Sequence, residues 1–463
     1  MSTASSFWND FKDAVRGTQQ DYTEGTVGRA VLLLAVPMVL ETAMESLFAI
    51  VDVFFVSRLG PAAVATVALS ESMMTLVFTV GLGLSIGVTA MVARRIGEHD
   101  PDAAARTTVQ AIGLGMAIAA VIAVVGSITA PQLLALMGAS DDVIANSSYT
   151  RVMLGGNATV LLLFLINAAF RGAGDAAVAM RVLWLANGIN IFLDPMFIFG
   201  IGPFPELGVL GAGVATNIGR GTAVVAQFWL LSRAGGRLHV RREHLQVLPA
   251  LMWRLVRLSG AGMFQVFISM ASWVGLIRIL AGFGDQVLAG YAIGIRLILF
   301  ALLPSWGMSN AAATMVGQSL GAGKPERAER SVWIAGFYNV VFLGSIGLLF
   351  IVFAPFIVSM FTTLPEPHRW GVLCLRIVSS GFLFYAYGMV LENAFNGAGD
   401  PWTPTWINLF CFWIIELPLA WFAAYLLGWG PNGVFIAMTV SFSALAVVSA
   451  YYFRKGSWKL KRV

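Results

Sequence analysis

Long apolar segments alternate along the chain with short stretches that are polar or rich in glycine and proline. Six of these segments precede a basic stretch and six follow it. Each is long enough to cross a bilayer as an α-helix, which needs about 20 residues. The predicted spans are residues 30–57, 63–92, 107–130, 146–170, 177–200, 208–231, 258–281, 287–317, 330–354, 370–395, 402–427 and 433–453. The pattern therefore predicts an all-α, polytopic membrane protein with 12 transmembrane helices.

The two halves of the chain repeat each other at a nearly constant offset of 224 or 225 residues. The matching pairs are RLGPAAVATVAL (58–69) with GFGDQVLAGYAI (282–293), TAMVARRIGEHDPDAAAR (89–106) with ATMVGQSLGAGKPERAER (313–330), and NAAFRGAGD (167–175) with ENAFNGAGD (392–400). Because each repeat holds an even number of spans, both copies have the same orientation in the membrane. We expect two pseudo-symmetric six-helix lobes that form a V-shaped cleft, which is the architecture of a transporter.

Composition supports a membrane protein and excludes several other classes. The chain is 58% hydrophobic and 11% charged, with a mean hydropathy of +0.79. Cys374 and Cys411 lie in apolar stretches and form neither a disulfide framework nor a metal-ligand spacing. The sequence has no P-loop, zinc-ligand cluster or acid-rich metal–diphosphate motif, so we predict no cofactor and no ATP hydrolysis. Its basic residues are spread between spans rather than gathered in one patch, so we predict no nucleic-acid partner.

The distribution of Lys and Arg predicts the orientation of the chain. Of the 29 basic residues, 22 lie in the tails or in the loops after even-numbered spans. Positive charge is retained on the cytoplasmic side, so both termini are placed in the cytoplasm and the protein in the plasma membrane. The predicted organisation is a cytoplasmic N-tail (1–29), an N-lobe (30–231), a basic cytoplasmic linker with an interfacial helix on anionic lipid (232–257), a C-lobe (258–453) and a cytoplasmic C-tail (454–463).

Three acidic residues interrupt the first span. Glu41, Glu45 and Asp52 project within an arc of about 40° on a helix, so all three face one way. The fifth span carries a similar polar stripe made of Asn187, Asn190 and Asp194. Ionisable side chains inside a membrane are expensive and mark functional sites by default.

Counting residues from the outer ends of the spans places several of these groups at one depth. A layer about 7–12 Å below the outer surface contains Asp52, Glu71, Asp194 and Thr216. Glu41 and Glu45 lie roughly 10–17 Å further in. Burial disfavours a charged carboxylate, so these acids could carry a proton. Alternatively, oxygens of Asp52, Asn190, Asp194 and Thr216 could bind a small cation such as Na⁺. The residues leave both interpretations open.

A purely structural interpretation is that buried arginines neutralise these acids, with Arg220 in the sixth span as the obvious partner. The second lobe argues against it. At the repeat offset it replaces the acids Glu41, Glu45, Asp52 and Glu71 by Gln265, Ser269, Leu276 and Ile295. At these four positions acids occur in one lobe only, which favours a single coupling site built from them over a structural requirement of both lobes.

Several motifs together resemble the multidrug and toxic compound extrusion (MATE) transporters. They are Pro37 in LAVPMV, VDVFFVSRLG in the first span, ARRIGE after the second, FRGAGD before the fifth, NIFLDP within the fifth, and the repeat of six plus six helices. The resemblance covers nearly the whole chain. It implies export of drugs, organic cations or metabolites in exchange for H⁺ or Na⁺, and we expect a monomer in the lipid bilayer.

The pattern resembles most the archaeal and DNA-damage-inducible-F branch of that family. Matching by position, the resemblance implies an ion-binding or protonating set made of Asp52, Asn190, Asp194 and Thr216. Pro37 matches the bend in the first helix. Glu45 is a departure, because that branch commonly has an amide there. Another branch couples Na⁺ through acids in helices 7 and 10, but residues 258–281 contain none, so we expect that site to be absent.

Two other function classes remain as alternatives. A flippase for lipid-linked sugars has a related two-lobe architecture, but it would need a strongly cationic cavity, whereas the N-lobe stripe is acidic. A membrane enzyme would need a reactive constellation that faces one aqueous side.

Overall fold

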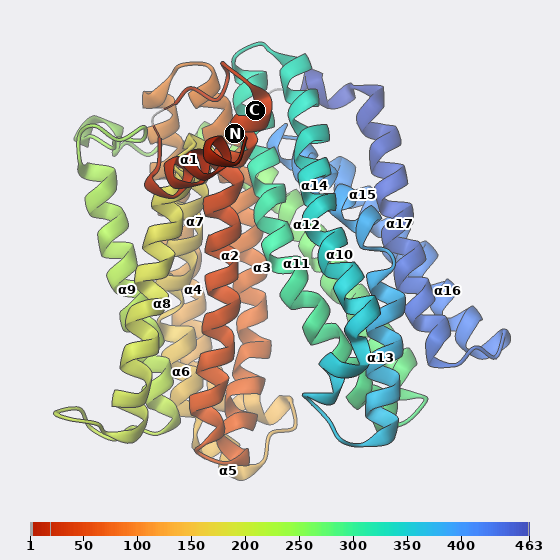
Figure 1. Cartoon of the computed structure of the whole chain (residues 1–463). Coiled ribbons are helices and arrows are strands. Elements are labelled where there is room, and N and C mark those ends of the chain that lie inside the picture. The colour runs from red at the N-terminus through yellow and green to blue at the C-terminus, as the bar shows by residue number, and fades with distance from the viewer. Residues whose placement is uncertain (1–2, 19, 462) are drawn as a thin grey trace.

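The computed structural model describes residues 3–18, 20–461 and 463, and these residues form helices and loops without a β-strand. The helices run side by side in two groups, and both ends of the chain lie at the same end of the bundle (Figure 1). We call this the terminal end.

The two groups follow the two repeats of the sequence. The first group contains α1 (Thr3–Arg16), α2 (Val27–Ser57), α3 (Pro61–Gly97), α4 (Pro101–Leu136), α5 (Asp141–Ala145), α6 (Ser147–Gly155), α7 (Asn157–Ala173), α8 (Ala176–Phe199) and α9 (Val209–Ser232). The second contains α10 (Pro249–Ala281), α11 (Asp285–Gly321), α12 (Pro325–Ser359), α13 (Pro365–Ser379), α14 (Phe382–Gly397), α15 (Trp402–Asn408), η2 (Leu409–Glu416), α16 (Leu417–Trp421), η3 (Phe422–Leu426) and α17 (Pro431–Lys455).

Most of the predicted spans meet the length and hydropathy expected of a membrane helix. Within the described part of the chain, 10 helices do so, and the pair α13 and α14, bent by 58°, makes up to 11. The remaining predicted span is α9, a helix of 24 residues that packs against α8. Its polar residues, among them Thr216, Arg220 and Gln227, lower its mean hydropathy. The predicted all-α membrane fold is confirmed.

The linker between the lobes differs from the predicted interfacial helix. Residues 233–248 contain one short 3₁₀ turn, Arg242–His244 (η1), and α10 already begins at Pro249. Proline is favoured at the first position of a helix because its missing N–H is not needed there. Residues 249–257 are therefore the first turns of a span rather than a separate helix.

The two lobes share a core at the terminal end. Buried side chains of α2, such as Leu34, pack in one cluster with Met315 of α11 and Phe395 of α14. A Cβ at Gly307 would stand 2.5 Å from the Met38 carbonyl oxygen, so glycine permits the close crossing of α11 over α2.

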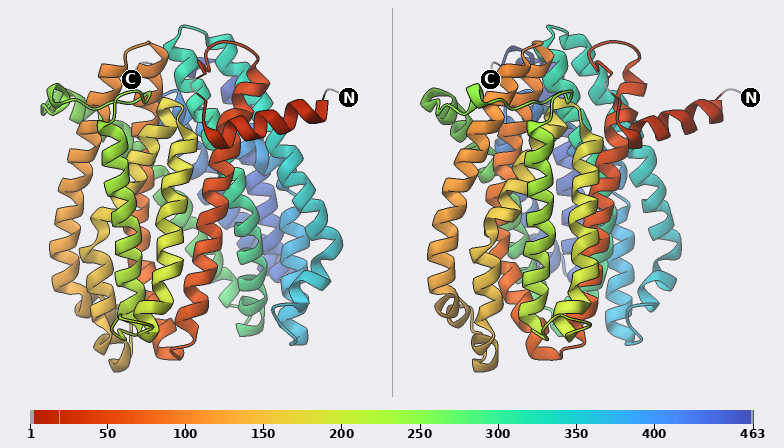
Figure 2. Two further views of the ribbon diagram at one scale, coloured as in Figure 1. Left: turned by 60° about the vertical axis from the view of Figure 1, so that its left-hand side comes forward. Right: turned by 90° about the vertical axis from the view of Figure 1, so that its left-hand side faces the viewer.

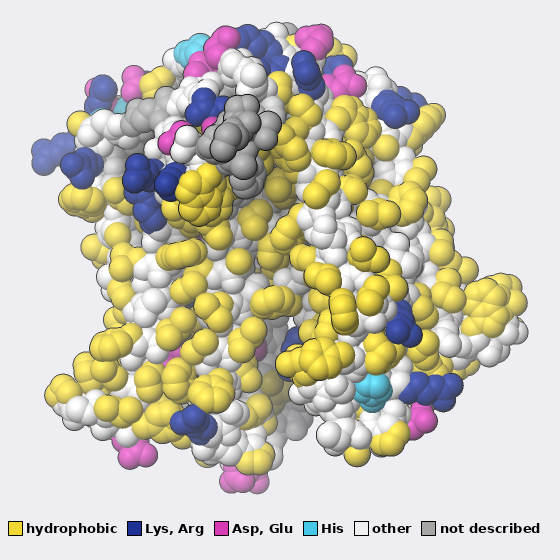
Figure 3. Space-filling view, in the orientation of Figure 1, with side chains coloured by type: hydrophobic (Ala, Val, Ile, Leu, Met, Phe, Trp, Pro, Cys, Tyr) yellow, Lys and Arg dark blue, Asp and Glu magenta, His cyan; other side chains and the backbone are white. Residues whose placement is uncertain are grey.

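Polar contacts also join the lobes at this end. Thr314 Oγ1 of α11 donates to the carbonyl oxygen of Arg171 at 3.1 Å, and Gln318 Nε2 donates to that of Gly172 at 2.8 Å. At the opposite end, separate clusters fill each lobe, and the surface is hollowed between the two halves (Figure 3). The molecule is thus closed at the terminal end and open at the other.

Candidate functional site

Helices α2, α8 and α9 pack against one another and bring the predicted coupling residues together. Asp52 lies on α2, Asn190 and Asp194 on α8, and Thr216 on α9. A Cβ at Gly219 of α9 would stand 2.6 Å from the Ala186 carbonyl oxygen of α8, so this glycine allows the two backbones to approach. That approach places Asn190 Nδ2 2.9 Å from Thr216 Oγ1, to which it donates a hydrogen bond.

The site is buried and rich in oxygen atoms without donors. Asp194 is 0% exposed and Asp52 is 8% exposed. Within the described part of the chain, Asp52 Oδ1, Asn190 Oδ1 and both carboxylate oxygens of Asp194 have no hydrogen-bond partner. Asp52 and Asp194 are near enough to interact electrostatically. Buried acceptors of this kind are costly unless a proton or a cation satisfies them, so the donor set fits H⁺ or Na⁺.

A tyrosine that the sequence did not single out completes this region. Tyr149 of α6 is buried and lies within electrostatic range of Asp52, Asp194 and Arg220. Its place near the outer end of the fourth predicted span could have marked it, because that is the depth of Asp52.

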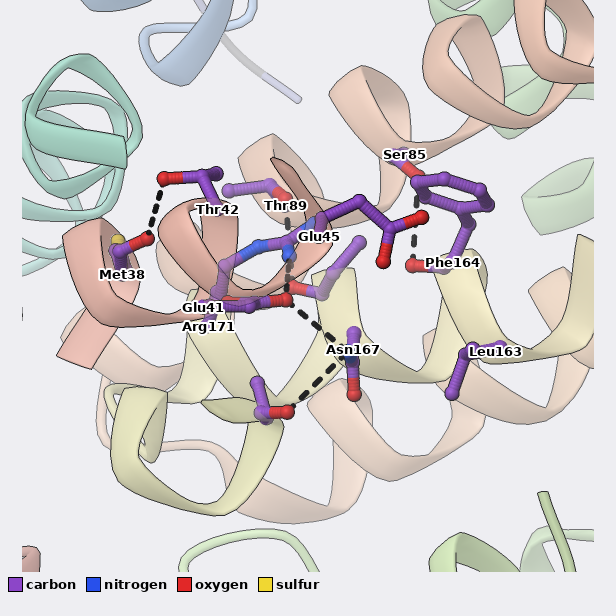
Figure 4. Close-up of polar contacts among 12 residues, drawn as sticks. Met38, Glu41, Thr42, Glu45, Ser85, Thr89, Leu163, Phe164, Asn167 and Arg171 are labelled. Atoms are coloured by element: carbon purple, nitrogen blue, oxygen red, sulfur yellow. Dashed lines mark hydrogen bonds and ion pairs between the residues drawn. The ribbon is translucent and has the colours of Figure 1, made fainter. Parts of the chain in front are cut away.

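Glu41 lies deeper and has its own partners. Arg171 Nη1 of α7 donates to Glu41 Oε1 at 2.7 Å, and Asn167 Nδ2 donates to the same oxygen at 3.1 Å (Figure 4). Arg171, whose side chain is 13% exposed, therefore neutralises this acid, whereas the purely structural interpretation named Arg220 as the obvious partner of the acids. Glu41 belongs to a structural ion pair rather than to the set with unpaired oxygens.

Glu45 is the partner of Arg220. Arg220 Nη2 contacts Glu45 Oε1 at 3.4 Å, and Asn187 Nδ2 donates to Glu45 Oε2 at 3.0 Å. The guanidinium also lies 5.8 Å from the ring centroid of Phe48 and 5.9 Å from that of Phe78. The Arg220 side chain is 7% exposed and that of Glu45 is 32% exposed, so this ion pair is only partly buried and its carboxylate is accessible.

Glu71 and Pro37 lie at the edges of the site. Glu71 on α3 is exposed and within electrostatic range of Asp52 and of Arg296 on α11, in the other lobe. Pro37 is buried, and α2 continues as one helix through it beside the crossing of Met38 with α11.

The ion pair of Glu41 gives a stability prediction. Arg171→Met should lower the free energy of unfolding by about 3–5 kcal/mol, because it leaves a buried carboxylate without a counter-charge. Adding Glu41→Gln should recover most of the loss. Thermal unfolding of purified protein measures both, with the exposed Arg278→Met as control. A double variant no more stable than Arg171→Met would contradict the pairing.

Comparisons with known proteins identify the family. The MatE family model matches residues 37–196 and 259–422, one stretch in each lobe. The FAD transporter of Shewanella oneidensis is 25% identical over 427 residues, which cover 92% of this chain and 94% of that protein. A probable multidrug resistance protein NorM of Thermotoga maritima is 24% identical over 445 residues, 94% of each chain.

Solved structures agree in fold. A MATE crystal structure in complex with MaL6 has a TM-score of 0.89 at 22% identity and covers 96% of this chain and 100% of its own. A MOP superfamily transporter of Pyrococcus furiosus has a TM-score of 0.87 at 22% identity, covering 97% and 98%. At this identity the likeness concerns the fold. Because the family model matches most of both lobes, the chain belongs to the MatE family of membrane transporters that export drugs and other toxic compounds, and it is not an enzyme.

Proposed function

We propose that the protein is a secondary active antiporter that exports amphipathic or cationic small molecules in exchange for H⁺ or Na⁺. The coupling ion binds at Asp52 and Asp194, with Asn190 and Thr216 as further oxygen ligands. The observation that carries the proposal is the contrast among the N-lobe acids. Glu41 and Glu45 contact arginines, whereas Asp52 Oδ1 and both Asp194 oxygens are buried without a hydrogen-bond partner in the described residues.

Alternating access follows from the two ends of the molecule. The terminal end is closed by packing between the lobes, and its basic loops and tails support a cytoplasmic position for it. The hollow at the opposite end then opens to the outside. We further propose that the protein acts as a monomer in the plasma membrane, with both termini and residues 232–257 on the cytoplasmic side.

The exchange cycle uses the site in both states. From outside, H⁺ or Na⁺ binds at Asp52 and Asp194 and lowers the negative charge of the N-lobe. Substrate that is held in the cleft is released outward, and the lobes tilt to open the cytoplasmic end. There the ion leaves and new substrate enters. Coupling requires that the ion and the substrate stabilise different states of the transporter.

Dye efflux from proteoliposomes under separately imposed H⁺ and Na⁺ gradients tests this function. The expected result is efflux driven by at least one gradient and abolished by its collapse. The substrate panel should contain a cationic dye, a neutral dye and FAD, since one relative is an FAD transporter. Equal, slow leakage under every condition would overturn the proposal.

Glu45 should set the preference for charge in the substrate. Glu45→Gln removes a negative charge that is one-third exposed and leaves Arg220 without its carboxylate. We expect coupled transport to persist, but the rate for a cationic dye should fall about fivefold relative to a neutral dye, the effect of roughly 1 kcal/mol. The exposed Glu326→Gln at the other end of the molecule is the control. An unchanged ratio between the dyes would rule out this role.

A further inference from the structure

The helix α1 lies across the ends of the spans instead of running with them. Figure 2 shows that it projects beyond the outline of the bundle at the terminal end. A helix at the level of the span ends, outside the perimeter of a membrane bundle, has the lipid headgroup layer beneath it.

Contacts with α2 and α8 fix the position of α1. Ala14 is 2% exposed and packs in the core shared by the lobes. Arg181 Nη2 of α8 donates to the carbonyl oxygen of Arg16 at 2.5 Å. Arg29 of α2 pairs through Nε with Asp10 at 2.8 Å and through Nη2 with Asp13 at 3.3 Å. The helix is therefore held at its inner end while its outer part projects.

The apolar face of α1 carries Trp8, which the protein leaves exposed, and the partly buried Phe11 and Val15. Trp8, Phe11 and Val15 project within about 60° of one another. Trp8 is 55% exposed and stacks on Phe11 with ring centroids 5.5 Å apart. Tryptophan is enriched at the boundary between headgroups and acyl chains, because its ring is apolar and its N–H is polar.

The charges of α1 are arranged to favour an anionic surface. The acids of this helix in the sequence, Asp10 and Asp13, are both paired with Arg29. Lys12 and Arg16 lie on one side of the aromatic face, about 40° and 80° from Trp8. They have no acidic partner in the described residues, and Lys12 Nζ lies 5.5 Å from the Trp8 ring. The charge that remains free on the helix is therefore positive.

We propose that α1 is an interfacial anchor that binds anionic lipid headgroups through Lys12 and Arg16 and inserts Trp8 and Phe11 at the base of the headgroup layer. The interfacial helix that the sequence suggested for the linker is thus formed by the N-terminal segment. The anchor acts on α2, the helix that carries Asp52, because Arg29 and Ala14 tie the two helices together. This inference does not depend on which ion or substrate is transported.

Photo-crosslinking of the full-length protein tests the anchor. Benzoylphenylalanine replaces Trp8, which keeps an aromatic side chain, and in a separate variant it replaces the exposed Asn9, about 100° around the helix. Both proteins are reconstituted in vesicles of phosphatidylcholine and phosphatidylglycerol, irradiated and analysed by mass spectrometry. We expect lipid adducts at position 8, enriched in phosphatidylglycerol over its share of the bilayer, and clearly fewer at position 9, which projects away from the aromatic face on the side of Arg16.

The basic residues are tested in the same format. The double variant Lys12→Gln with Arg16→Gln should lower the ratio of phosphatidylglycerol to phosphatidylcholine adducts at position 8 by up to about fivefold for each basic residue removed. Adducts at position 8 with protein instead of lipid would overturn the proposal and indicate a second chain or another face of this one. Equal lipid labelling at positions 8 and 9, or enrichment unchanged in the double variant, would also overturn it. The lipid adducts can be measured whether or not the protein transports dye.

Discussion

Asp52→Asn is expected to reduce gradient-driven efflux to the leak of empty vesicles, a loss of at least about tenfold, while the protein still folds. The amide keeps the shape and polarity of the side chain but can neither take up a proton nor offer a negative charge to Na⁺. The repeat explains why folding should survive. The equivalent position in the second lobe is Leu276, which is 3% exposed and packs in the apolar core of that lobe.

Stability should not fall in this variant, because the replaced carboxylate has an oxygen without a partner in the described residues and a buried charge is costly. Efflux and thermal unfolding are measured on the same preparation. Asp285→Asn is the matched control, since it makes the same chemical change at an exposed position. Efflux at the wild-type rate in Asp52→Asn would remove this residue from the mechanism.

The fold could be predicted from the sequence because a bilayer demands long apolar helices, and these are visible without knowledge of packing. The helix ends were predicted less accurately. The span predicted at 107–130 belongs to α4, which runs from Pro101 to Leu136. This helix starts earlier than predicted because of its local capping residues, which the length of the apolar segment does not indicate. Asp100 accepts a hydrogen bond from Ala103 N at 2.8 Å as an N-cap, and Pro101 follows at the first helical position.

Helix geometry predicted which residues of the candidate site share one face of a helix. Projection placed Asn187 and Glu45 on polar stripes of two helices, and in the structure the two side chains form a hydrogen bond at 3.0 Å. Helix projection could not predict the partner of Glu41. Arg171 lies near the end of α7, next to a loop, and only the packing of α7 against the rest of the N-lobe directs its guanidinium inward.

The repeat explains why the pair of Glu41 and Arg171 is a feature of one lobe. In the second lobe, Gln265 and Asn396 occupy the two corresponding positions. Both members of the pair are replaced by neutral amides, so neither position carries a charge that would lack its counter-charge. Sequence repeats can therefore indicate which buried charges belong together, once one pair is seen in a structure.

Asp194→Asn should abolish coupled efflux as completely as Asp52→Asn does, and the double variant should be no worse than either single variant. The physical reason is that both carboxyl groups serve one ion. They interact electrostatically, and Asn190, four residues before Asp194 on α8, connects to Thr216 of α9. Residues that form one site have strongly non-additive effects when they are substituted.

Efflux at saturating gradient is measured first for the two single variants and the double variant. If all three are inactive, their equal rates do not tell one shared site from two separate sites. Equilibrium binding of the coupling ion to purified protein is therefore the measurement that distinguishes these two cases. With one shared site, each single variant loses the same fraction of bound ion, and the double variant loses nothing further. If each substitution instead removed its own share of binding, so that the double variant lost the sum of the two, Asp52 and Asp194 would be two separate sites and the single-site mechanism would be wrong.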